Sequence, residues 1–126
     1  MYKNIVLVDD DSDDAEIFCE AIYSFDENIV CLTETNPVKA LDNLKNVENP
    51  PDLIFLDYNM PVLNGNEFLK KMRKVQQLSK IPVILYSNYS EAAAEQLCIT
   101  QDTERYITKP NSFDELAAVL KNILAA

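Results

Sequence analysis

The sequence predicts an α/β domain with a doubly wound, five-stranded parallel sheet and five helices. Three observations predict this fold. Short apolar runs have the length and the branched or aromatic content of buried strands. Segments with apolar residues at helical spacing separate them, so strands and helices alternate along the chain. Four of the runs end in polar residues of complementary chemistry, which are Asp9-Asp10, Asp57, Ser87 and Lys109.

The first half of the chain contains two strand–helix units. Residues 5–8 form the first strand, and Ser12 can cap the helix that follows, with Asp11 and Asp13 as competing candidates. Residues 29–33 form the second strand, after which Asn36 and Pro37 are a favoured cap and first-turn pair. The apolar residues expected to face the core are Ala15, Phe18, Cys19 and Ile22 in the first helix, and Val38, Leu41 and Leu44 in the second.

The second half repeats the pattern three times. Residues 49–51 (Asn-Pro-Pro) end the second helix before the strand 53–56, and a loop over 58–65 follows, where Gly65 is expected to adopt a positive φ. Pro82 opens the strand 83–86, and residues 91–98 form a weaker, alanine-rich helix. Residues 106–108 are the last strand, and Ser112 with Glu115 forms a capping box. The residues expected to face the core are Phe68, Met72 and Val75 in the helix that follows the loop, and Phe113, Leu116, Ala117, Leu120 and Leu124 in the last helix.

Length and composition narrow the class of protein. The chain has 126 residues, 48% hydrophobic and 25% charged, so we expect a single domain over residues 1–126 without an output domain. No apolar stretch approaches the roughly 20 residues needed to span a bilayer, and no signal-peptide pattern opens the chain. A net charge of -10 disfavours nucleic acid as a partner. We therefore expect a cytoplasmic protein that binds neither nucleic acid nor membrane.

The cysteines give no sign of a metal or redox motif. Cys19, Cys31 and Cys98 are odd in number and lack the C-x-x-C spacing of zinc and redox sites. We expect buried, reduced thiols.

The polar residues at the strand ends predict a phosphoryl-transfer site. The carboxyl ends of the strands in an open parallel sheet form its ligand crevice, so Asp9, Asp10 and Asp57 should converge there. Carboxylates about 4 Å apart repel by about 4 kcal/mol at an effective dielectric near 20, and a cation must offset this. Hard oxygen ligands in a chain without histidine suit Mg²⁺. Lys109 adds a second cation and Ser87 a hydroxyl, a set that can stabilise a phosphoryl group moving onto an aspartate.

Four motifs carry a resemblance to a known family. They are Val8-Asp9-Asp10, the segment 56–61 (Leu-Asp-Tyr-Asn-Met-Pro) with Gly65, Tyr86-Ser87, and the segment 106–110 (Tyr-Ile-Thr-Lys-Pro). In this order, each at a strand end, they resemble the receiver domain of two-component response regulators, and the resemblance covers all 126 residues. It implies a flavodoxin-like receiver fold.

The resemblance also implies a role for each site residue. Asp57 would be the phosphoacceptor, with Mg²⁺ bound by Asp57, by Asp10 directly, by Asp9 through water, and by the backbone carbonyl of Asn59. Ser87 and Lys109 would hold the phosphoryl oxygens, and the bond between Lys109 and Pro110 would be cis. Tyr106 would be an aromatic switch that turns inward when Ser87 moves toward the phosphate.

On this resemblance the chain is a stand-alone response regulator and not an enzyme in the usual sense, because it would catalyse only its own phosphorylation and dephosphorylation. With no histidine, it needs a sensor histidine kinase or a histidine phosphotransfer protein as donor. It would signal through a changed surface of the fourth helix, fifth strand and fifth helix to a downstream protein, and a homodimer is compatible with this. The acidic run 9–14 resembles single-domain receivers paired with sensor or phytochrome-type kinases.

Other interpretations stay open. A haloacid-dehalogenase-like phosphoesterase needs an acid two residues after the nucleophile, where this chain has Asn59. A pseudo-receiver would bind partners without phosphorylation. Taken singly, Asp9 and Asp10 could be helix caps and Tyr106 an edge-strand core residue, while Asp13 and Asp14 are expected only to favour the first helical turn electrostatically.

Four positions depart from or qualify the family pattern. Asp102 and Thr103 stand where receivers usually carry a Gly-Ala pair, and Asn88 stands where a small residue commonly follows the hydroxyl. Tyr89 is expected to shield the phosphoryl group from water and so to prolong the phosphorylated state.

Overall fold

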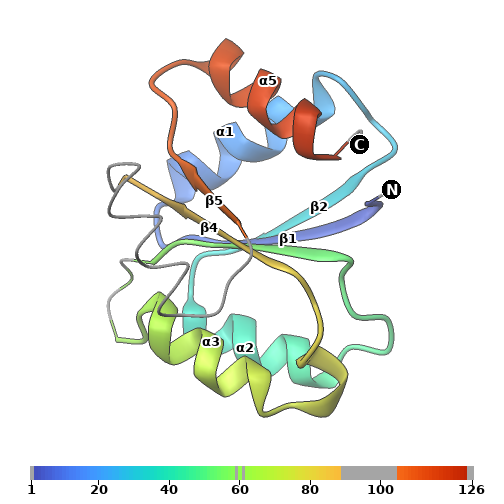
Figure 1. The fold of residues 1–126 in the computed structure, drawn as a ribbon, viewed down its shortest axis with the longest axis vertical. Coiled ribbons are helices and arrows are strands. Elements are labelled where there is room, and N and C mark those ends of the chain that lie inside the picture. The colour runs from blue at the N-terminus through green and yellow to red at the C-terminus, as the bar shows by residue number, and fades with distance from the viewer. Residues whose placement is uncertain (1, 59, 61, 89–104, 125–126) are drawn as a thin grey trace.

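A five-stranded, all-parallel sheet forms the centre of the molecule (Figure 1). The structure, a computed structural model, describes residues 2–58, 60, 62–88 and 105–124. The strand order is β2-β1-β3-β4-β5. The strands are β1 (Asn4–Val8), β2 (Val30–Glu34), β3 (Leu53–Leu56), β4 (Val83–Ser87) and β5 (Arg105–Thr108). This is the doubly wound, flavodoxin-like order, so the predicted fold class is confirmed.

Helices cover both faces of the sheet. Figure 1 shows α1 and α5 on one face and α2 and α3 on the other. Their bounds are α1 (Ser12–Tyr23), α2 (Pro37–Asn46), α3 (Gly65–Arg73) and α5 (Phe113–Leu124), with a short 3₁₀ turn, η1 (Gln76–Leu78), after α3. The helix predicted over residues 91–98 lies outside the described residues. Among those that are described, no helix has the length and apolar character needed to cross a membrane.

The central strands are apolar on both sides because both of their faces are buried. Leu53 and Phe55 of β3 belong to the core under α1 and α5, whereas Ile54 and Leu56 belong to the core over α2 and α3. The α1 side is centred on Phe18, whose ring lies edge-on to Phe55 at 4.9 Å. Continuous apolar runs are what such a sheet requires, and this is why the sequence identified them as strands.

The structure confirms the predicted cap of α2 and selects one of the candidate caps of α1. Asn36 caps α2 as expected, since its side chain accepts hydrogen bonds from the backbone N–H groups of Val38 and Lys39. The cap of α1 is Asp11, not Ser12. The Asp11 carboxylate accepts the N–H groups of Asp13 and Asp14, and a charged acceptor at this position also interacts favourably with the helix dipole.

Two of the residues expected in the core are on the surface. Val38 is 51% exposed and Phe113 is 42% exposed. The buried stripe of α2 follows Pro37, Ala40, Leu41 and Leu44, and Val38 lies about 100° round the helix from Pro37. In α5 the buried stripe begins at Leu116, one turn after Phe113.

Gly65 is required for a close approach rather than for a positive φ, which no described glycine adopts. A Cβ at this position would lie 2.8 Å from Tyr58 Cα and 3.1 Å from the carbonyl oxygen of Asp57. The Gly65 N–H also donates to the Tyr58 carbonyl at 2.8 Å. The absence of a side chain therefore lets α3 begin directly against the backbone that carries Asp57.

Replacing Gly65 should show the cost of closing this space. Alanine in a helix is ordinarily more stable than glycine by about 1 kcal/mol, but the clash with backbone should reverse the sign. We expect Gly65→Ala to lower the free energy of unfolding by about 1–3 kcal/mol, measured by urea titration. Lys70→Ala, at an exposed position of the same helix, is the control and should change it little. Equal stability of Gly65→Ala and wild type would contradict the steric role.

Candidate acidic site at the carboxyl edge of the sheet

The topology brings Asp9 and Asp57 together. β1 and β3 are neighbours at the point where the strand order reverses, with Val8 paired to Leu56. The N–H of Asp57 donates to the Val8 carbonyl at 2.9 Å, which extends the pairing by one residue. Carboxylate oxygens of Asp9, Asp10 and Asp57 all lie within 4.8 Å of one another. The expected convergence of these three acids is thus found in the structure.

The three carboxylates differ in their access to water. Asp9 is fully buried, Asp57 is 6% exposed, and Asp10 is exposed. One oxygen of Asp9 accepts the Asp11 N–H at 3.0 Å, and the other accepts Lys109. Both Asp9 oxygens are therefore occupied, as a buried carboxylate requires.

Lys109 is the cation at the centre of the acidic group. Its Nζ lies 3.0 Å from Asp9 Oδ2, 2.9 Å from Asp14 Oδ2 and 3.7 Å from Asp57 Oδ2. The side chain is only 10% exposed, and Nζ lies 5.2 Å from the centroid of the Tyr86 ring. Its backbone N–H donates to the Ser87 carbonyl at 2.7 Å, which fixes the end of β5 against β4. One lysine thus contacts three acids and offsets part of their negative charge.

The surroundings keep Lys109 charged. Burial lowers the pKa of Lys109, but its hydrogen bonds to Asp14 and Asp9 and the charge of Asp57 outweigh this and raise the pKa above its ordinary value. Burial likewise raises the pKa of Tyr86, although the positive charge of Lys109 opposes the shift. At neutral pH the site therefore presents an ammonium beside a neutral phenol.

Asp14 is the site residue that sequence reasoning missed. We expected it only to favour the first turn of α1, yet it makes the shortest of the three ion pairs with Lys109 Nζ. Its side chain is 37% exposed, and the lysine lies 95 residues away in sequence. The topology could have indicated its role. When a helix follows a strand directly, its first turn lies at the sheet edge where the strand ends, so Asp14 is expected near the site.

The remaining predicted residues have mixed outcomes. Ser87 is the last residue of β4 and 2% exposed, and Tyr106 in β5 is half-buried against the core on the α2 and α3 side. No described peptide bond is cis, so the expected cis bond between Lys109 and Pro110 is wrong; the trans isomer is the intrinsically preferred one. Cys31 is buried and Cys19 half-buried, both with free thiols. Predictions for Asn59, Tyr89, Cys98 and Asp102-Thr103 fall outside the described residues.

The donor set fits Mg²⁺. Ligand oxygens about 2.1 Å from an octahedral ion lie up to about 4.2 Å apart, close to the span of the three carboxylates here. All the donors are hard oxygens, and the exposed Asp10 leaves room for the waters that Mg²⁺ retains.

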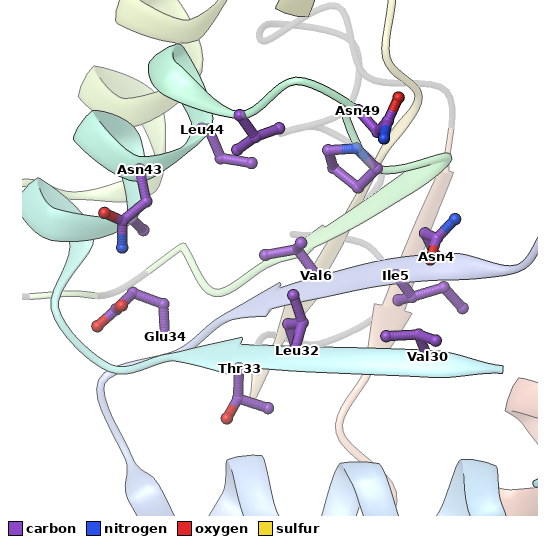
Figure 2. A pocket seen from close by; sticks show the side chains of 13 residues that line it. Asn4, Ile5, Val6, Val30, Leu32, Thr33, Glu34, Asn43, Leu44 and Asn49 are labelled. Atoms are coloured by element: carbon purple, nitrogen blue, oxygen red, sulfur yellow. The ribbon is translucent and has the colours of Figure 1, made fainter.

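A separate hollow of about 510 Å³ lies elsewhere, between the edge strand β2 and α2. Figure 2 shows Val6, Leu32 and Leu44 among the side chains that line it. None of the predicted site residues lines this hollow, so it is distinct from the acidic site.

The role of Lys109 can be tested by removing its charge. We expect Lys109→Met to lower the free energy of unfolding in metal-free buffer by about 3–5 kcal/mol, because buried carboxylates lose their partner. Urea titration measures this, with Lys121→Met, at an exposed position of α5, as the control. An unchanged stability in Lys109→Met would mean that the acids do not depend on this cation.

Comparison with known proteins agrees with this geometry. The model of the response regulator receiver domain matches residues 5–121. The polar-differentiation response regulator DivK of Brucella anthropi is 27% identical over 124 residues, which are 98% of both chains. The sensor histidine kinase CheAY of Helicobacter pylori is 29% identical over 117 residues, which are 93% of this chain but 14% of CheAY.

A solved structure of a response regulator is also similar to this chain. The phosphorylated cyanobacterial phytochrome response regulator RcpA superposes with a TM-score of 0.83 at 26% identity, covering 98% of this chain and 91% of RcpA. The length of the curated relatives varies, since the chain spans 49% of the regulatory protein YvcP of Bacillus subtilis and nearly all of DivK. The chain belongs to the receiver domain family of two-component response regulators.

Proposed function

We propose that this receiver domain accepts a phosphoryl group on Asp57 from a histidine kinase or a histidine phosphotransfer protein, in a reaction that depends on Mg²⁺. The observation that carries the proposal is the gathering of Asp9, Asp10 and Asp57 at the carboxyl edge of the sheet, with the Lys109 ammonium beside Asp9 and Asp57. Receiver domains are signalling proteins that histidine kinases phosphorylate, and the family match supports the same donor here.

Asp57 is the best nucleophile of the three acids. Both oxygens of Asp9 are engaged, by the Asp11 N–H and by Lys109. Asp10 is exposed to water, which would compete for a phosphoryl group attached there. Asp57 lies between these extremes, 6% exposed and 3.7 Å from the ammonium. It is shielded enough to protect an acyl phosphate and close enough to positive charge to receive one.

The other residues would stabilise the incoming group. The ligands of Mg²⁺ would be Asp57, Asp10, Asp9 through water, and the Asn59 carbonyl that family likeness adds. The ion, when bound, offsets the charge of the phosphoryl oxygens. Lys109 would bind one phosphoryl oxygen, since its ammonium already lies 3.7 Å from the Asp57 carboxylate and would have to move only a short way to reach a group attached there. The Ser87 hydroxyl would bind another phosphoryl oxygen. These contacts hold and neutralise the group without further covalent chemistry.

The signal would be read from the surface of the domain. Tyr106 lies in β5 at an intermediate burial, a position from which it can turn inward, and β5 pairs with β4, which carries Ser87. The likeness to DivK, over 98% of both chains, supports signalling by the receiver domain itself through phosphorylation-dependent binding of a protein. A pseudo-receiver would instead bind its partner whether or not Asp57 is phosphorylated.

Phosphorylation from a small donor tests the acceptor. Wild-type protein incubated with acetyl phosphate and Mg²⁺ should gain the mass of one phosphoryl group, measured on the intact protein. Asp57→Asn should gain none, because it keeps the shape of the side chain but loses the nucleophilic oxygen. Asp42→Asn, at an exposed position of α2, is the matched control and should be modified like wild type. A phosphoryl adduct on Asp57→Asn would assign the reaction to another residue.

Metal binding has an independent readout. Mg²⁺ that binds only the folded protein raises its stability by mass action, so millimolar Mg²⁺ should raise the melting temperature of wild type. The rise should shrink or vanish in Asp10→Ala. Asp13→Ala removes an equally exposed acid of the first turn of α1 and should keep the full rise. An equal rise in Asp10→Ala and wild type would place the ion elsewhere.

A further inference from the structure

Two cysteines lie in contact on the face of the sheet covered by α1 and α5. Cys19 of α1 and Cys31 of β2 have their Sγ atoms 3.0 Å apart, and Cys19 Sγ is also 3.7 Å from the Cys31 carbonyl oxygen. Both thiols are free. Cys31 is 7% exposed, while Cys19 is half-buried, so a small reagent can reach only Cys19 with ease.

Tyr23 holds the two elements in this register. Its hydroxyl donates to the Cys31 carbonyl and accepts the Cys31 N–H, each at 3.3 Å. Tyr23 lies four residues after Cys19, on the same face of α1. The helix is therefore fastened to the residue of β2 that carries the second thiol, and the two sulfurs are kept together.

The two thiols differ in acidity. The Cys31 thiol can donate a hydrogen bond to a Cys19 thiolate, which lowers the pKa of Cys19, although burial opposes the shift. The same contact, together with burial, raises the pKa of Cys31. The more accessible sulfur is thus also the better nucleophile, and the buried one is placed to resolve its oxidised form.

We propose that Cys19 and Cys31 form a reversible disulfide when the protein meets hydrogen peroxide. A disulfide has sulfurs about 2.05 Å apart, so the two need to approach by only about 1 Å. A neutral oxidant suits this chain, because a net charge of -10 repels anionic disulfides such as oxidised glutathione. The proposal is independent of phosphorylation on Asp57.

The reaction balances in two steps. The Cys19 thiolate attacks one peroxide oxygen, the O–O bond breaks, and a sulfenic acid forms on Cys19 as hydroxide leaves. The Cys31 sulfur then attacks the Cys19 sulfur, the S–O bond breaks, and the Cys31 proton passes to the departing hydroxide to give water. The hydroxide from the first step takes up the proton that the Cys19 thiol released when it ionised. In sum, two thiols lose two electrons and two protons, and one peroxide becomes two waters.

Peroxide treatment of the full chain tests the proposal. Wild type should lose the mass of two hydrogens, yield a peptide that joins Cys19 to Cys31, and return to its starting mass with a reductant. Cys98→Ser should behave in the same way. Cys31→Ala should instead leave a Cys19 sulfenic acid that dimedone traps, and thiol loss in Cys19→Ala should be slower than in wild type by about tenfold or more.

Melting provides a second measurement. Closing the loop between residues 19 and 31 restricts the unfolded chain, so the oxidised protein should melt several degrees above the reduced one. Oxygen addition without loss of two hydrogens, a crosslink through Cys98, or equal rates in wild type and Cys19→Ala would each overturn the proposal. The two thiols would then be packing residues only.

Discussion

The burial of Asp9 beside Asp57 is the constraint on which the acidic edge depends. A carboxylate with no access to solvent is tolerated only when it is hydrogen-bonded and paired with a cation. The strands on either side of β1, which are β2 and β3, contain no basic residue that could pair with Asp9. Lys109 supplies the cation from the end of β5, across the ends of β3 and β4. The hydrogen bond from the Lys109 N–H to the Ser87 carbonyl fixes the position of the lysine backbone. The length of the lysine side chain and its contact with the face of the Tyr86 ring then determine where the ammonium lies.

The same arrangement leaves the site short of positive charge. The site contains four carboxylates, those of Asp9, Asp10, Asp14 and Asp57, and one ammonium, which gives a formal charge of -3. A divalent ion at the carboxylates would reduce this charge and would leave Lys109 able to bind a new negative group. Because the ammonium lies closer to Asp9 and Asp14 than to Asp57, a phosphoryl group on Asp57 would have to compete with these two acids for the ammonium.

Much of this could be predicted from the sequence, because the decisive signals are local. The apolar runs identify the strands, and their order along the chain places Asp9, Asp57, Ser87 and Lys109 at one edge. The errors concern choices that local sequence does not determine. Asp11 and Ser12 are adjacent and both able to cap α1, so the backbone path decides between them. Gly65 must lack a side chain because the backbone of Tyr58 lies against it, and Asp14 belongs to the site because it pairs with a lysine 95 residues away. Neither contact can be recognised from a periodic pattern in the sequence.

α1 links the acidic edge to the cysteine pair. Its first turn places Asp14 against Lys109, its middle places Cys19 against Cys31, and its last turn fastens Tyr23 to β2. A helix of 12 residues is about 18 Å long and moves nearly as one body, so these contacts are not independent. If Lys109 leaves Asp14 for a phosphoryl oxygen, α1 loses a contact at its first turn while its other end stays held by β2. A disulfide between Cys19 and Cys31 would strengthen that hold, and the freedom of the first turn to respond would then depend on the oxidation state of a thiol pair at the middle of the helix.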